Sequence, residues 1–117
     1  CEPFVAPMDV RLGPLGASDD EIETVVQPDI LVVCDGKKID ARGCKGAPDL
    51  IVEVLSPSTA TRDQFLKANV YERYGVREYW LLDPVHRFLT IRRLNSQGRW
   101  QPSDVQKAAG SIPVTVL

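Results

Sequence analysis

The feature that most constrains the fold is an apolar run at residues 50–55 that contains one acidic side chain, Glu53. Its length and its content of Val, Ile and Leu predict a strand that is covered on both faces of a sheet. A lone ionised carboxylate in such a place costs several kcal/mol, so it must be neutralised, paired or bound to a cation. Glu53 is therefore the first candidate for a functional site.

A second apolar block, residues 30–34, has the same buried-strand character. Each block follows a proline-aspartate pair, which ends in Asp29 in one case and Asp49 in the other. Four strand residues place the Cα atoms of Asp49 and Glu53 about 13 Å apart, too far to share one ion. Residues opposite each other in paired strands lie about 5 Å apart. If the two blocks pair, Asp29 is the aspartate that can meet Glu53.

The remaining pattern predicts a mixed α and β fold. Four further strands are expected, at residues 3–12, 78–84, 87–94 and 112–117, the middle two forming a hairpin. One helix is expected at residues 60–74, which contain neither Gly nor Pro. Ser58 or Thr59 can cap its start, and Gly75 fits the left-handed residue that commonly ends a helix.

Length and composition fit one globular domain. The chain has 117 residues, of which 44% are hydrophobic and 26% charged, so we expect a single domain over residues 1–117. It begins at Cys1 rather than Met and enters a strand almost at once, and we therefore expect preceding residues to be missing or removed by processing. The net charge of -2 gives no overall field that attracts nucleic acid, so any such binding must be local.

Cysteine content and hydropathy indicate the compartment. Three cysteines, an odd number without a closely spaced pair, suggest neither a disulfide framework nor a zinc motif. We expect reduced thiols, with Cys34 in the core and Cys44 in a loop. No apolar run approaches the roughly 18 residues needed to span a bilayer. These features favour a cytoplasmic protein without membrane association.

Three residues are of the types that metal-dependent cleavage of a phosphodiester requires: Asp29, Glu53 and Lys67. Such cleavage needs two or three hard oxygen ligands for Mg²⁺, and usually a cation near the attacking water or the scissile phosphate. The sequence thus favours a magnesium site built on Asp29 and Glu53.

Five motifs of this chain form a set: residues 25–30, residues 52–59, Asp63 with Lys67, residues 74–76 and residues 78–84. Together they resemble the Uma-type putative restriction endonuclease family, formerly a domain of unknown function. The resemblance runs from about residue 4 to residue 83 and beyond. It implies membership of the PD-(D/E)XK nuclease superfamily. The implied fold class is α/β, with a restriction-endonuclease-like core in which a mixed twisted sheet carries a flanking helix.

The resemblance also implies roles for individual residues. In that superfamily an Asp on one strand and a Glu or Asp on the next bind a metal, and a Lys two residues after the Glu assists. It assigns Asp29 and Glu53 to the metal, with Mg²⁺ as the ion and Mn²⁺ as an alternative. The backbone carbonyl of Val54 or Leu55 completes the shell. The implied reaction is Mg²⁺-dependent endonucleolytic hydrolysis of DNA.

The chain departs from the superfamily pattern in two places. The position two residues after Glu53 carries Leu55, whose side chain can neither donate a proton nor stabilise charge. The family's lysine comes instead from the following helix, where Lys67 matches it, and its long stem can reach back over the sheet. The second departure is the first helix of the superfamily core, which is missing here.

Each site assignment has a structural alternative. Glu53 could pair with a buried basic residue or face solvent on a half-exposed strand. Asp29 could be a turn residue after Pro28. Lys67 could form a surface ion pair with Asp63 one turn earlier, an interaction worth less than about 1 kcal/mol.

Other polar and aromatic residues have weaker signals. Tyr71 and Tyr74 share a helix face with Lys67 and fit core packing better than substrate contact. His86 falls in the predicted hairpin turn, where a solvated role is expected. A phosphate-binding rim could be formed by Arg87, Arg92, Arg93 and Arg99. Strand alternation weakens this idea, because it turns two neighbouring arginines to opposite faces.

Two functions of other classes stay open at this point. The first is a catalytically inactive nuclease fold that serves as a module for protein interaction or dimerisation, which the acidic net charge and Leu55 favour. The second is a protein that binds nucleic acid without cleaving it, which would show a steep salt dependence of binding. Nucleases that cut both DNA strands are commonly dimers, so a homodimer is a further possibility.

Overall fold

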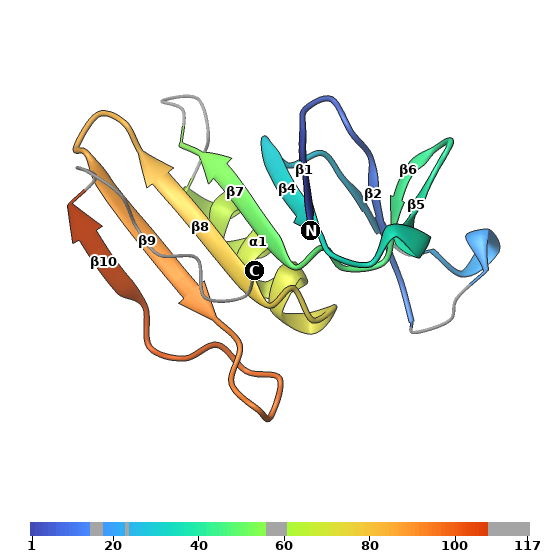
Figure 1. Cartoon of the computed structure of the whole chain (residues 1–117). Coiled ribbons are helices and arrows are strands. Elements are labelled where there is room, and N and C mark those ends of the chain that lie inside the picture. The colour runs from blue at the N-terminus through green and yellow to red at the C-terminus, as the bar shows by residue number, and fades with distance from the viewer. Residues whose placement is uncertain (15–17, 23, 56–60, 108–117) are drawn as a thin grey trace.

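The computed structural model describes residues 1–14, 18–22, 24–55 and 61–107. Its larger sheet has the strand order β1-β4-β7-β8-β9-β10 (Figure 1). These strands are β1 (Glu2–Val5), β4 (Ile30–Val33), β7 (Leu50–Val54), β8 (Glu78–Asp83), β9 (Phe88–Arg93) and β10 (Asp104–Lys107). β7 and β8 pair in parallel, and the other neighbouring strands of this sheet pair antiparallel. The four strands expected between residues 30 and 94 are confirmed to within one residue at each end.

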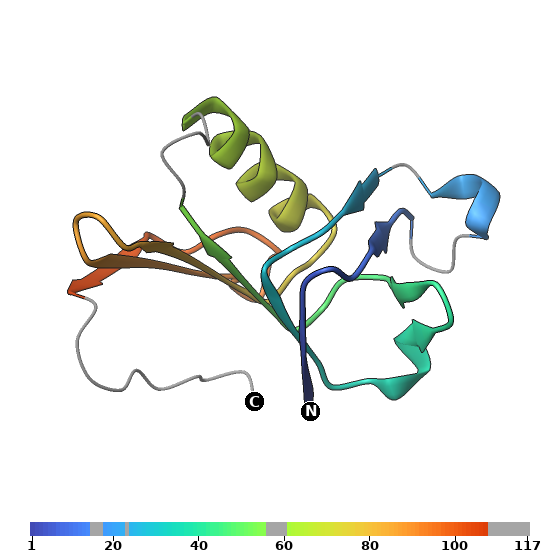
Figure 2. The ribbon, with the colours of Figure 1, turned by 90° about the horizontal axis from the view of Figure 1, so that it is seen from above.

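The described residues contain one α helix, α1 (Thr61–Arg73). It connects the parallel strands β7 and β8 and lies on one face of the larger sheet (Figure 2). Gly75 follows it in the left-handed conformation with a φ of 83°. The expected helix and its terminal glycine are confirmed, whereas Ser58 and Thr59 lie outside the described residues. No helix within the described ranges is long and apolar enough to cross a membrane.

A smaller sheet has the strand order β3-β2-β6-β5. Its strands are β2 (Val10–Leu12), β3 (Thr24–Val26), β5 (Ile39–Asp40) and β6 (Gly43–Lys45), and the 3₁₀ helices η1 (Asp19–Glu21) and η2 (Gly36–Lys38) lie between them along the chain. Strands of two or three residues are too short to show the periodicity that reveals a strand in a sequence. The sequence prediction therefore missed β3, β5 and β6.

One hydrophobic core joins both sheets and α1. Its buried members are Val10, Leu12, Leu31, Val33, Cys44, Ile51, Ala68, Tyr71, Val76 and Tyr79. Side chains alternate between the two faces of a strand, so the core positions of β4 and β7, which are Leu31, Val33 and Ile51, all face α1. Glu53, two residues after Ile51, therefore faces the helix as well. The α/β fold class expected from the sequence is confirmed.

The single strand expected at residues 3–12 is wrong. This segment forms β1 and β2, which belong to different sheets. The pairing of β1 with β4 ends at Val5, which lies opposite Ile30. The amide of Ala6 still donates to the carbonyl of Asp29 at 2.9 Å before the chain leaves this sheet. The strand expected at residues 112–117 lies outside the described residues, and the missed strand β10 pairs with β9.

The cysteines differ from the expectation of three reduced thiols. Cys1 and Cys34 form a disulfide. The antiparallel pairing of β1 with β4 places Glu2 opposite Val33, so the next residues outward meet. Cys34 is exposed rather than part of the core, and Cys44 is buried in β6 rather than in a loop. The sequence could not show this because the pairing of β1 with β4 connects distant parts of the chain.

Candidate functional site

Asp29 and Glu53 face each other at one end of the β4–β7 pair. The antiparallel register places Ile30 opposite Val52, so the next pair along the ladder is Asp29 and Glu53. Paired residues point to the same face of a sheet, about 5 Å apart at their Cα atoms. Glu53 is buried, with 6% of its surface exposed, whereas Asp29 is exposed. The pairing that the sequence required for a shared ion is therefore present.

Asp29, the residue before β4, bonds to β7 through its side chain. Its Oδ2 accepts a hydrogen bond from the backbone N–H of Val54 at 2.7 Å. The amide of Leu55, the next residue, donates a hydrogen bond to the backbone carbonyl of Leu82 in β8 at 2.8 Å. Because the N–H and C=O of one strand residue point toward the same neighbour, the Val54 carbonyl also points to the β4 side. The carboxylate of Asp29 and this carbonyl thus lie on the same side of β7.

Lys67 reaches Glu53 from α1. Its Nζ lies 3.3 Å from Oε1 of Glu53, and its side chain is 40% exposed whereas that of Glu53 is 8% exposed. The lysine therefore connects the buried carboxylate to the solvent. The alternative partner from the sequence, the side chain of Asp63, lies outside the side chains that the structure describes.

Neighbouring groups shift the pKa of Glu53 in both directions, and the net shift is upward. Burial raises the pKa of its carboxyl group above the usual value, the Lys67 ammonium group opposes this shift, and the negative charge of Asp29 adds to it. The influence of Asp29 means that the two carboxylates are close enough to repel each other. A cation between them would relieve this repulsion.

Tyr71 and Tyr79 place their hydroxyl groups near Glu53. Tyr71 on α1 and Tyr79 on β8 are buried, with ring centroids 5.1 Å apart in an edge-on arrangement. The hydroxyl of Tyr71 is close enough to Glu53 to lower the pKa of that carboxyl group by hydrogen bonding, after the larger effects of burial and Lys67. The hydroxyl of Tyr79 has no hydrogen-bond partner within the described part of the chain. Burial, and then the charge of Glu53, raise the pKa of both. Buried polar atoms are rarely left unpaired, so the Tyr79 hydroxyl suits a site that receives water or ligand oxygens.

Sequence reasoning placed Tyr71 in the core and did not select Tyr79. Tyr71 is a core residue, but its hydroxyl also faces Glu53. Tyr79 lies directly opposite Ile51 in the parallel β7–β8 pair, and thus next to the residue pair that carries the site. Only the parallel register places it there, so alternation within β8 alone gave no signal.

Asp49 has a structural role at the opposite end of β7. Its Oδ2 accepts a hydrogen bond from the amide of Cys34 at 2.7 Å, and its Oδ1 lies 3.7 Å from the guanidinium of Arg77. The choice of Asp29 over Asp49 as the partner of Glu53 agrees with this geometry.

His86 and the four arginines that the sequence suggested lie in different parts of the structure. His86 is exposed in the turn between β8 and β9, and its Nδ1 lies 2.8 Å from Asp83. Arg93 pairs with the buried Glu78 at 2.5 Å on the face away from α1. Arg92, opposite Tyr79 in the β8–β9 pair, lies on the α1 face. Arg87 and Arg99 are exposed and in connections. The four arginines therefore do not form one rim.

The oxygen donors at the Asp29–Glu53 pair fit a hard divalent cation. Two carboxylates and a backbone carbonyl are oxygen ligands of the kind that Mg²⁺ takes, and Mg²⁺ commonly keeps several waters and uses only one or two carboxylates. Nowhere in the described ranges do three or more His, Cys, Asp or Glu side chains gather as a metal site. Waters and substrate oxygens would supply the other ligands.

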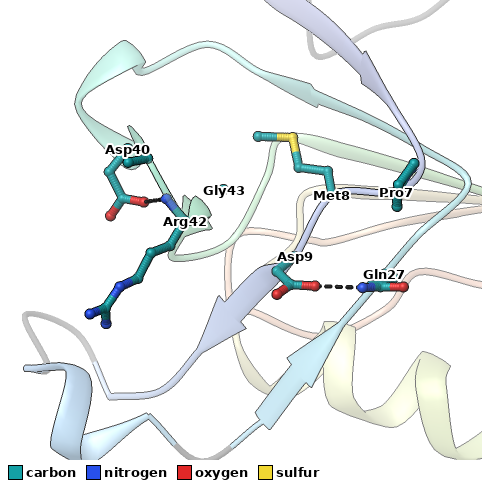
Figure 3. A pocket seen from close by; sticks show the side chains of 8 residues that line it. Pro7, Met8, Asp9, Gln27, Asp40, Arg42 and Gly43 are labelled. Carbon is teal, nitrogen blue, oxygen red and sulfur yellow. Dashed lines mark hydrogen bonds between the residues drawn. The ribbon is translucent and has the colours of Figure 1, made fainter.

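A separate hollow of about 400 Å³ opens beside the smaller sheet (Figure 3). It is lined by Pro7, Met8, Asp9, Gln27, Asp40, Ala41, Arg42 and Gly43. The Asp9 carboxylate accepts a hydrogen bond from the Gln27 amide there, at 2.6 Å, so its polar groups already serve one another. None of the candidate residues Asp29, Glu53 and Lys67 contributes to it.

Comparison with known proteins gives two matches. The sequence profile of the Uma2 family, described as a putative restriction endonuclease, matches residues 2–117. A crystal structure described as a putative nuclease belonging to DUF820 from Anabaena variabilis aligns with a TM-score of 0.68 and 21% identity. The alignment covers 97% of this chain and 59% of that one, so the chain spans about three-fifths of that protein's length. This likeness shows a shared nuclease fold. No curated protein matches the chain.

Proposed function

Because the chain belongs to the Uma2 family of putative restriction endonucleases, we propose that it hydrolyses DNA phosphodiester bonds as a Mg²⁺-dependent endonuclease. Mn²⁺ is an alternative ion. The observation that carries the proposal is the strand register that sets Asp29 opposite the buried Glu53, with Lys67 3.3 Å from the latter. An ion pair with Lys67 would require only Glu53, whereas a divalent cation would account for two carboxylates at this place.

The chemistry assigns a role to each group. Asp29, Glu53 and the Val54 carbonyl would hold the ion. A bound Mg²⁺ supplies Lewis-acid polarisation of the scissile phosphate and a more acidic water. The Lys67 ammonium, which is partly solvent-exposed, orients the attacking water or stabilises the charge that develops on the phosphate. This arrangement replaces the strand lysine that Leu55 cannot provide.

Cleavage of supercoiled plasmid DNA with Mg²⁺ or Mn²⁺ tests the proposal. We expect the wild-type protein to nick or linearise the plasmid, and Asp29→Asn, Glu53→Gln and Lys67→Met to reduce the rate by at least about 10²-fold, as removal of a group that stabilises the transition state does. Glu2→Gln, an exposed change on β1, is the matched control and should keep the wild-type rate. Equal rates for wild type and Glu53→Gln would exclude the assignment.

An inactive module for protein interaction or dimerisation is the second candidate, and Leu55 is the observation that favours it. The two candidates differ in metal binding. Calorimetric titration with Mn²⁺ should give heat that Asp29→Asn abolishes if the chain is a nuclease. No binding by either protein would favour the inactive module. Binding of DNA without any product would instead favour the non-cleaving nucleic-acid binder.

Assembly and compartment complete the proposal. A homodimer would present two sites for a double-strand cut, and light scattering of the purified protein measures its mass directly. A cytoplasmic location, which action on cellular DNA favours, and the Cys1–Cys34 disulfide predict different states of the thiols in the cell, because cytosolic thiols are kept reduced. Alkylation of thiols in intact cells, followed by mass analysis, would decide between one and three free cysteines.

A further inference from the structure

Part of the sheet face that carries the site extends beyond α1. In both ribbon views β10 and the adjoining part of β9 lie to one side of the helix (Figures 1 and 2). On this face Phe88 is 48% and Val105 is 59% exposed. The surface next to the candidate site is therefore open to a large ligand.

Arg92 is the basic residue of β9 on this open face. It lies opposite Tyr79 across the β8–β9 pair, and Tyr79 lies opposite Ile51 across the β7–β8 pair. Glu53 is two residues beyond Ile51 on the same face. With strands about 4.8 Å apart and a rise of about 3.3 Å per residue, the Cα atoms of Arg92 and Glu53 are about 12 Å apart. Their side chains can therefore contact neighbouring groups of one ligand.

Arg92 also differs from other arginines of the chain in its partners. Arg11 pairs with Asp40 and Arg77 with Asp49. The adjacent Arg93 has two acidic partners, Glu78 and Asp104, on the other face. Within the described ranges, by contrast, no carboxylate lies within ion-pair distance of Arg92, a half-buried residue.

The buried hydroxyl of Tyr79 connects Arg92 to the site. Burial is the main cause that raises the pKa of Tyr79, the charge of Glu53 raises it further, and the charge of Arg92 lowers it. Both charged groups thus act on one hydroxyl that has no hydrogen-bond partner in the described structure. A guanidinium has a planar fork of donors that matches phosphate oxygens, and it keeps its charge at any physiological pH.

We propose that Arg92 binds a backbone phosphate of the substrate next to the phosphate that is cleaved. This inference rests on the proposed function, because it takes Asp29 and Glu53 as the reaction centre. It names a second anchor for the nucleic acid, in a protein whose net charge of -2 provides no general attraction. Arg92 is thereby a substrate-binding residue, and Arg93 beside it is structural.

Salt-dependent binding to a fluorescent DNA duplex tests this inference without cleavage. The parent is Glu53→Gln, which is not expected to cut, and anisotropy is measured over a series of KCl concentrations. Adding Arg92→Gln should weaken binding several-fold at low salt and make the slope of log K against log salt shallower by about 1, the value for one lost phosphate contact. Arg92→Lys, which keeps the charge, should restore the slope.

Arg99→Gln, an exposed change of equal charge in a connection, is the control and should leave slope and affinity unchanged. Thermal melts check that each variant is folded. An unchanged slope for Arg92→Gln, an equal effect of Arg99→Gln, or absence of binding by the parent would overturn the inference. If the wild-type protein fails to cleave but Arg92→Gln changes the slope, the proposed reaction fails and the phosphate site stands.

Discussion

The carboxylate of Asp29 and the backbone amide of Val54 are joined by a 2.7 Å hydrogen bond, which ties the residue before β4 to the end of β7. This bond fixes the aspartate beside Glu53. It also gives Asp29 a structural task in addition to the proposed metal-binding one. Variants of Asp29 that lose the negative charge but keep an oxygen that accepts the hydrogen bond can distinguish the structural task from metal binding.

Asp29→Asn and Asp29→Ala should therefore differ. Asparagine keeps an oxygen that can accept from Val54, so its melting temperature should stay near that of the wild type while Mn²⁺ affinity falls at least about tenfold, since 1.4 kcal/mol of lost attraction suffices for that. Alanine also loses the hydrogen bond, at a cost of about 1 kcal/mol. Thermal melts and calorimetry measure both. Wild-type Mn²⁺ binding by Asp29→Asn would leave only the structural task.

The Glu53–Lys67 contact should show measurable coupling. Lys67→Met leaves a buried carboxylate without its cation, and we expect a loss of about 1 kcal/mol, kept small because the lysine is partly exposed. Glu53→Gln removes the charge, so adding Lys67→Met to it should cost less. Urea unfolding of the four proteins in the double-mutant cycle gives the coupling energy. Additive effects would mean that the contact contributes nothing to stability.

The Asp29–Glu53 pairing could be anticipated because Glu53 lies within one apolar strand and Asp29 directly precedes another. An embedded acid and an aspartate after proline are local signals, and one assumption about pairing brings them together. The parallel pairing that sets Tyr79 beside Ile51 is not local, and neither is the β1–β4 pairing behind the Cys1–Cys34 disulfide. Such partners follow only from the order of strands in the sheet.

Alternation along β9 correctly separated Arg92 from Arg93, but it could not say which of them is paired. That depends on Glu78, which the parallel β7–β8 pair places on the face away from α1. The strands β5 and β6 were missed because two or three residues are too few to show the alternation that reveals a strand.

Substitution by methionine should lower the stability of the protein much more at Arg93 than at Arg92. Glu78 is fully buried, and Arg93→Met leaves it without its guanidinium partner, so we expect a loss of about 3 kcal/mol. Arg92→Met removes no ion pair within the described structure and should change stability by less than about 0.5 kcal/mol. Urea unfolding midpoints compare the two. A larger loss for Arg92→Met would reverse the assignment of structural and substrate-binding arginines.

Cys44 should be unreactive in the folded protein. Burial raises the pKa of its thiol to about 11 from an ordinary value of 9.0. Because the folded pKa is raised, the stabilising effect of the neutral thiol is fully present below pH 9 and is lost as the pH rises through about 11. At pH 8 we expect no reaction with dithiobis-nitrobenzoate in the native state.

The same reagent counts thiols after unfolding in guanidinium chloride without a reductant. One thiol should react, and Cys44→Ala should abolish that signal, because Cys1 and Cys34 are joined in a disulfide. Three reactive thiols in the unfolded wild-type protein would contradict the disulfide. Rapid reaction of the native protein would contradict the burial of Cys44.

Gly43→Ala should be strongly destabilising, in contrast to Gly36→Ala. Gly43 has a φ of 117°, which side-chain-bearing residues rarely adopt, and an added Cβ would overlap the backbone oxygen of Asp9. That oxygen cannot move freely, since it accepts the amide of Cys44 at 2.8 Å. We expect a loss of more than about 2 kcal/mol, the combined cost of strain and a disturbed hydrogen bond. Gly36 has nothing within 4 Å of its added Cβ and should be nearly neutral. Equal urea midpoints for the two variants would show that β6 does not need this close approach to β2.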